Sequence, residues 1–277
     1  MENIRERIVS CAGRVWFCAK ELLKWLALAM ITGVPCGIIG AAFDLAVEHV
    51  TELRTEHTAI LFLLPVIGLV IVAFYKAAKL EGVSTDDMID CVKDGKPIRF
   101  WLLPVMFIST VLTHLGGGSA GREGAALQIG GSLGCYVGQL FRLDEKDMRI
   151  ATLCGMSAVF SALFGTPLTA TIFALEVISV GVFYYSALVP CIVASLAALA
   201  ISNAFGIAPT HFTFALTAAP RLLLLLRVAA LAAVCSLMSI LFCVTMHGTE
   251  RLFAGRIQNP WPVSYTHLRA HETGRNL

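Results

Sequence analysis

The stretch Gly116–Gly124 reads GGGSAGREG and is followed directly by AALQIG. Apolar segments flank it, and Arg122 and Glu123 are the only charged residues between Phe100 and Phe141. Glycines allow positive φ and close approach of the backbone, and the residues after Glu123 can begin a helix. The pattern predicts a helix that starts inside an apolar environment and leaves backbone free before it to face a ligand.

The rest of the chain is also strongly apolar. Of its 277 residues, 57% are apolar before the 23 glycines are counted, and 14% are charged, against about 25% in soluble domains. Such a chain cannot cover its own surface with polar groups. The net charge of +2 gives no reason to expect nucleic acid as a partner. The nine cysteines include no C-x-x-C pair, so we expect packing residues and neither a metal site nor a cofactor. The composition predicts an all-α, polytopic membrane protein in a lipid bilayer.

Six windows are apolar enough to cross a bilayer, for which about 20 residues are needed. Two further apolar stretches are shorter and lie against breaks that contain Gly or Pro, which predicts broken and re-entrant helices. The six windows are Trp25–Val47, Ala59–Ala78, Pro97–Leu115, Ile150–Phe164, Phe183–Ala204 and Leu222–Met246, and the two shorter stretches are Ala125–Phe141 and Pro167–Val182.

Lys and Arg near the first spans indicate the orientation of the chain. Residues 1–24 carry five of them, as do residues 76–99, whereas the intervening loop His49–Thr58 carries only Arg54. We therefore expect a cytoplasmic, amphipathic helix over residues 1–24 and a multi-pass domain of the cell membrane over residues 25–262. Residues 263–277 read VSYTHLRAHETGRNL and resemble translated sequencing-adapter DNA, so we expect a non-native tail, with a native polar tail as the alternative.

The two charges of the glycine-rich stretch have two interpretations. A charge at bilayer depth costs about 2.5–3.5 kcal/mol or more, so it is functional or tightly paired. A local Arg122–Glu123 pair could fix the loop, although neighbours at a helix start point in different directions. Alternatively, the first turn of the helix binds an anion through its free N–H groups. The carboxylate of Glu123 can occupy that site and must leave it when protonated, so one residue could serve as gate and proton carrier.

Two other places contain candidate residues. Glu176 is the only charged residue between Ile150 and Pro220. We expect it to be either a proton relay or a hydrogen-bonded structural anchor. Ser84 and Asp87 match a capping box that starts a short helix, which could turn a second N-terminus toward the pore.

Residues 121–134, GREGAALQIGGSLG, resemble the signature of the voltage-gated chloride channel (ClC) family, G-R/K-E-G-P followed by a V-Q-I-G-like run. Ser161–Glu176 resembles the next conserved segment of that family, and the resemblance runs from about Trp25 to Met246. It implies a homodimer in which each subunit has its own anion pathway and two inverted repeats. This chain would hold the first repeat and the start of the second, so we expect it to be incomplete beyond Pro262 and not to transport alone. By the same resemblance Glu123 is the gating glutamate, and the anion-binding residues are Gly121, Arg122, Gly124, Ala125, Val83 and Ser84.

Departures from the family pattern bear on the subtype. Ala125 stands where the family has Pro, and Gly82–Asp86 matches the family's G-S-G-I-P only at Gly82. Val177 stands where proton-coupled chloride exchangers have an inner glutamate, and Glu176 aligns with its neighbour. The combination most resembles the bacterial fluoride/proton antiporter branch. We expect antiport of chloride or fluoride against protons, with a passive voltage-gated chloride channel as the alternative.

An enzyme pattern is also present. Residues 117–121 fit G-x-S-x-G, which would make Ser119 the nucleophile of an intramembrane serine hydrolase with His114 or His211 as its base. That motif requires a strand before the turn, and here an apolar helical segment precedes it. We therefore expect a transporter and not an enzyme.

Overall fold

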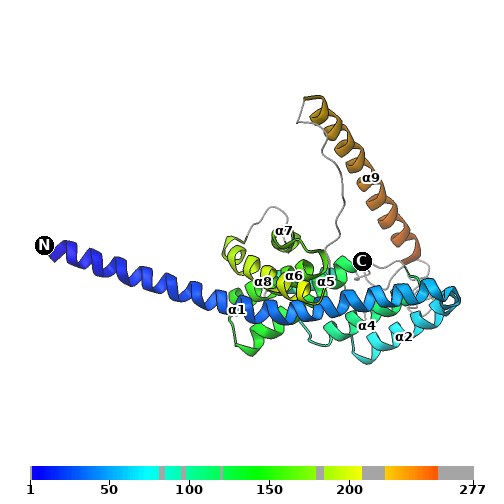
Figure 1. Ribbon diagram of the computed structural model, residues 1–277, viewed down its shortest axis with the longest axis horizontal. Coiled ribbons are helices and arrows are strands. Elements are labelled where there is room, and N and C mark those ends of the chain that lie inside the picture. The colour runs from blue at the N-terminus through cyan, green and yellow to red at the C-terminus, as the bar shows by residue number, and fades with distance from the viewer. Residues whose placement is uncertain are drawn as a thin grey trace. The chain divides into compact units, whose positions relative to one another are not determined.

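The computed structural model describes residues 2–80, 85–94, 98–118, 121–178, 184–207 and 222–254. Within these ranges the chain is helical and contains no strand, which confirms the predicted all-α fold. The chain divides into two units, residues 1–210 with 264–277 and residues 211–263, which are described separately. The first unit holds α1 (Glu2–Glu56), the 3-10 helix η1 (Thr58–Leu63), α2 (Leu64–Ala77), α3 (Thr85–Asp94), α4 (Leu102–Leu115), α5 (Arg122–Leu140), α6 (Glu145–Phe164), α7 (Pro167–Ile178) and α8 (Tyr185–Ala204) (Figure 1).

Helix α6 lies at the centre of this unit and packs against α5, α8, α1 and α7. Leu153, Met156 and Val159 of α6 are fully buried there. The contact with α5 is a backbone contact, since a Cβ on Gly130 or Gly134 would overlap carbonyl oxygens of α6. Small residues at such crossings let helix backbones meet in an apolar solvent. Gly130 and Gly134 therefore let the backbones of α5 and α6 pack closely.

Local sequence explains where α6 begins and ends. The carboxylate of Asp144 accepts a hydrogen bond from the backbone N–H of Asp147 at 2.8 Å, which caps the first turn. Gly165 ends the helix in the left-handed region at φ 68°, a conformation that glycine adopts without strain. Pro167 then begins α7, where its fixed φ suits a first helical residue.

Five helices of the described residues are long and apolar enough to cross a membrane: α1, η1 with α2, α6, α8 and α9. They correspond to five of the six predicted windows. The sixth, Pro97–Leu115, is wrong as a full span, because the helix there comprises only Leu102–Leu115. Fourteen residues rise roughly 21 Å at 1.5 Å each, less than the hydrocarbon core of about 30 Å. The two shorter predicted stretches, α5 and α7, are helices.

The first helix differs from its prediction in length. Residues 1–24 and the span after them were expected as separate segments, yet α1 continues unbroken from Glu2 to Glu56. The predicted loop His49–Thr58 is therefore mostly helical. Propensity explains the extension, since residues 48–56 contain no Gly or Pro to end the helix.

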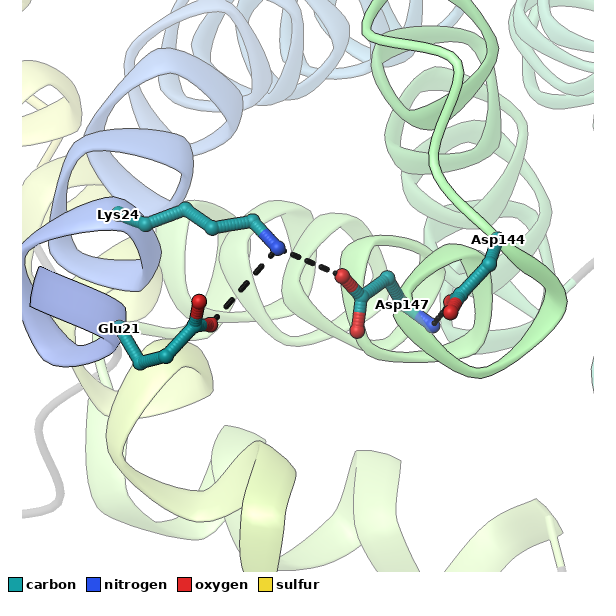
Figure 2. A network of polar contacts seen from close by, with 4 residues as sticks. All are labelled: Glu21, Lys24, Asp144 and Asp147. Carbon is teal, nitrogen blue, oxygen red and sulfur yellow. Dashed lines mark hydrogen bonds and ion pairs between the residues drawn. The ribbon is translucent and has the colours of Figure 1, made fainter. Parts of the chain in front are cut away.

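A polar network ties α1 to the start of α6 (Figure 2). The Nζ atom of Lys24 lies 2.8 Å from Oδ2 of Asp147 and 3.8 Å from Oε2 of Glu21. The Lys24 side chain is 40% exposed, so the pair contributes only about 0.2–1 kcal/mol. Its consequence is geometric, because it joins the polar end of α1 to the capped end of α6.

The second unit contains α9 (Leu222–Ala254). Its described side chains are exposed along the helix, including a run of leucines from Leu222 to Leu226. A helix that is apolar all round is suited to a lipid environment or to further helices.

Candidate functional site

The N-terminal end of α5 forms the candidate site. Gly121 precedes the helix with extended backbone at φ −71° and ψ 131°, and within the described part of the chain no side chain is seen to cap the first turn. The free N–H groups and the positive end of the helix dipole are therefore available to an anion. Glu123 is exposed at this end, Gly124 is half-buried and Ala125 is fully buried. A helix beginning here matches the prediction drawn from the glycine-rich stretch.

The carboxylate of Glu123 folds back over its own helix end. A Cβ built on Gly121 would lie 3.0 Å from Oε2 of Glu123. A negative charge in this position interacts favourably with the helix dipole, by about 0.3–1 kcal/mol at exposed sites. One carboxylate oxygen of Glu123 therefore lies beside Gly121, the residue that precedes the helix.

Arg122 does not pair with Glu123 in the described part of the chain. Its Nη1 atom lies 2.9 Å from Oδ1 of Asp44 on α1. The alternative of a local Arg122–Glu123 pair is therefore wrong, and Arg122 pairs with a residue 78 positions away. The side chain of Asp44 is 16% exposed and that of Arg122 is 41% exposed, so the pair is partly shielded from solvent.

Our sequence reasoning missed Asp44. A signal was available, since Asp44 is the only charged residue in the predicted span Trp25–Val47. An ionisable residue within a membrane span indicates function or pairing. The glycine-rich stretch contains a cation, Arg122, that could be the partner of Asp44. What the sequence could not supply was the packing of α1 against α5.

A side chain of α1 contacts the chain just before the loop that leads to the site. Nη1 of Arg54 donates to the carbonyl oxygen of His114 at 2.9 Å, at the C-terminal end of α4. Gly117 follows with φ 77°, a left-handed conformation in which a side chain would also overlap Leu61. These contacts explain Gly117 in structural terms and set where the loop toward Gly121 begins.

The hydrolase alternative finds no support in the described residues. Nδ1 of His114 lies 2.8 Å from the carbonyl oxygen of Thr110, one turn back on its own helix. Ser119 and His211 lie outside the described residues. The preceding element is the helix α4 and not a strand.

Val83 and Ser84 also lie outside the described residues, but the helix that follows them is described. As the capping box predicts, a short helix, α3, begins at Thr85. Arg149 of α6 holds the other end of α3, because its Nε donates to the carbonyl oxygen of Val92 at 3.0 Å and its Nη2 donates to that of Lys93. A cation at a helix C-terminus interacts favourably with the dipole. The position of α3 is thus set from its C-terminal end.

Glu176 lies exposed on α7, whereas Val177 beside it packs against the hydrophobic core. Within the described ranges we find no hydrogen bond to Glu176, so the interpretation as a structural anchor has no contact to support it. The described residues also contain no group of three or more His, Cys, Asp or Glu side chains suited to a metal. Buried cysteines occupy packing positions, with the Sγ atoms of Cys154 and Cys191 3.8 Å apart.

Comparison with known proteins identifies the class. The sequence model of the family described as voltage gated chloride channel matches residues 67–268, so this chain belongs to that family. A chloride/fluoride channel protein of Pseudomonas syringae pv. tomato is 36% identical over 230 residues, which are 82% of this chain and 50% of that protein. The H(+)/Cl(-) exchange transporter ClcA of Salmonella arizonae is 32% identical over 57% of this chain and 37% of its own length. The chain thus spans half the length or less of these relatives.

Solved structures agree with this assignment. The crystal structure of a CLC-type fluoride/proton antiporter matches with a TM-score of 0.83 and 27% identity, over 90% of this chain and 64% of that one. A slow cyanobacterial Cl-/H+ antiporter matches with a TM-score of 0.74 over 88% of this chain and 61% of its own, and at 21% identity it shows the fold alone. The chain therefore belongs to the voltage gated chloride channel family and shares the fold of the solved CLC structures.

Proposed function

We propose that this protein exchanges fluoride or chloride for protons, with Glu123 as both the gate and the proton carrier. The observation that carries the proposal is the carboxylate of Glu123 beside the uncapped first turn of α5. In this position the carboxylate takes the place of the transported anion. The anion would be bound by backbone N–H groups from Gly121 to Ala125, and by those of Val83 and Ser84 at the start of α3.

The exchange follows from a competition for one helix end. The ionised carboxylate of Glu123 is attracted by the helix dipole and excludes the anion. A protonated carboxyl loses that attraction, leaves the helix end and lets the anion enter. Return of the carboxylate expels the anion and releases the proton, so proton and anion move in opposite directions.

The subtype and the assembly belong to the same proposal. Val177 in place of the inner glutamate, and the similarity to the CLC-type fluoride/proton antiporter, favour fluoride. We propose that two subunits form a homodimer in the cell membrane, with the N-terminus of each in the cytoplasm. Transport is proposed and not enzyme chemistry, because the relatives are named as channels and exchangers.

A passive channel is the second candidate, since the relative from Pseudomonas syringae is named a channel. Selectivity and coupling depend on pore geometry at the ångström level, so an assay must separate the two. Liposomes that contain the intact protein would be loaded with fluoride or chloride. Efflux would be followed with ion-selective electrodes and internal pH with a probe.

The expected result is fluoride release accompanied by proton uptake. Glu123→Gln mimics the protonated carboxyl and should abolish proton movement. Glu145→Gln is the matched control, because Glu145 is also an acid in the first turn of a helix, α6. Proton movement that persists unchanged in Glu123→Gln would refute the gate, and chloride release without proton movement would identify a passive channel.

A further inference from the structure

The ion pair between Asp44 and Arg122 is the one charged contact that the described residues make with the first turn of α5. It joins the C-terminal third of a membrane-crossing helix, α1, to the residue next to Glu123. Asp44 lies between Phe43, which is fully buried, and Val47, which is 4% exposed. A carboxylate in such surroundings is costly unless it is paired.

The pair makes the surroundings of the candidate site neutral. A guanidinium at the first position of α5 would by itself add a full positive charge to the partial charge of the helix end. The carboxylate of Asp44 at 2.9 Å cancels that charge and turns the Arg122 side chain toward α1. The anion and the Glu123 carboxylate are then attracted by the helix end alone.

We propose that Asp44 is a positioning residue of the gate: by binding Arg122 it docks the start of α5 on α1 and keeps anion affinity low enough for release. This inference rests on the proposed anion site of α5. A transporter must bind its ion firmly enough for entry and weakly enough for exit. An unpaired Arg122 would hold both the anion and the ionised Glu123 too tightly.

The proposal predicts effects of opposite sign from the two partners. Asp44→Asn leaves an unpaired cation beside the helix end, so the anion should bind about tenfold more tightly. Arg122→Gln leaves an unpaired carboxylate, so the anion should bind about tenfold more weakly. The double variant removes both charges and should return the Kd to within about threefold of its starting value.

Isothermal titration of the intact protein with sodium fluoride and sodium chloride measures these effects. All variants are made in the Glu123→Gln background, so that the carboxylate does not compete with the anion. Asp44→Glu should restore the original Kd because it retains the charge. The control is Glu145→Gln in the first turn of α6, where the side chain is exposed and should not alter binding.

A purely structural pair would give a different result. Both single variants would then yield less monodisperse protein, with the same Kd in the fraction that folds, and this outcome would overturn the inference. An unchanged Kd in Asp44→Asn would also overturn it. If Asp44→Asn does not fold, Arg122→Gln and the double variant still give the sign test. If the background protein binds neither anion, the proposed site itself fails and the inference fails with it.

Discussion

The backbone contact between α5 and α6 provides a prediction of stability. In Gly130→Ala the new methyl group would lie 2.8 Å from the carbonyl carbon of Gly155 and 2.9 Å from Cα of Met156, with the Gly155 oxygen closer still. Carbon atoms in contact prefer about 3.5–4.0 Å, so the two helices must separate by roughly 1 Å. Backbone cannot rotate away as a side chain can, and overpacking of this kind costs about 1–3 kcal/mol.

An opposing term must be subtracted. Alanine favours a helix interior over glycine by about 0.8–1 kcal/mol, which leaves a net loss of up to about 2 kcal/mol. A loss of about 2 kcal/mol lowers the ratio of folded to unfolded protein by about 30-fold. Thermal unfolding in detergent, followed by the loss of the monodisperse gel-filtration peak, would measure it.

The next residue along the helix serves as a matched control. In Gly131→Ala the methyl group would meet side chains and no backbone: Met88, at 3.1 Å from Sδ and 3.2 Å from Cε, and Cγ of Met156 at 3.3 Å. These side chains can shift by a few tenths of an ångström, so the cost should be offset by the helix propensity. If Gly130→Ala is no more destabilising than Gly131→Ala, the reasoning from backbone contact is wrong.

Three further substitutions each test the role of one residue. Arg149→Ala removes the donors to the carbonyl oxygens of Val92 and Lys93. The substitution should lower the free energy of unfolding by about 1–3 kcal/mol and speed hydrogen exchange in α3, and unchanged exchange would contradict the capping role. Glu176→Gln alters an exposed side chain, so the yield of folded protein should stay the same and stability should change by at most about 0.5 kcal/mol; a loss of yield would revive the structural anchor. Ser119→Ala should leave labelling by a serine-reactive fluorophosphonate unchanged, because we expect no labelling of the parent protein, and labelling lost on this substitution would support the hydrolase.

The positions of most helices could be predicted from the sequence for a simple physical reason. Hydropathy located the helices because a membrane span must be apolar and must satisfy its own backbone. Hydropathy did not locate their ends equally well. The apolar window from Pro97 is longer than helix α4, and α1 runs past its apolar window at both ends. Apolarity reports the solvent of a segment, whereas helix ends depend on capping and on the packing of neighbouring helices.

The sequence likewise predicted only part of the candidate site. The glycines, the two charges and the start of a helix at Arg122 followed from the sequence alone, because they are local properties of contiguous residues. The partner of Arg122 did not, since Asp44 is 78 positions away and only the packing of α1 on α5 brings the two together. The sequence by itself determined a membrane protein with a helix end suited to an anion. The tertiary structure decided which carboxylate neutralises Arg122 and which one is left at the helix end, because charge pairing depends on distance in space.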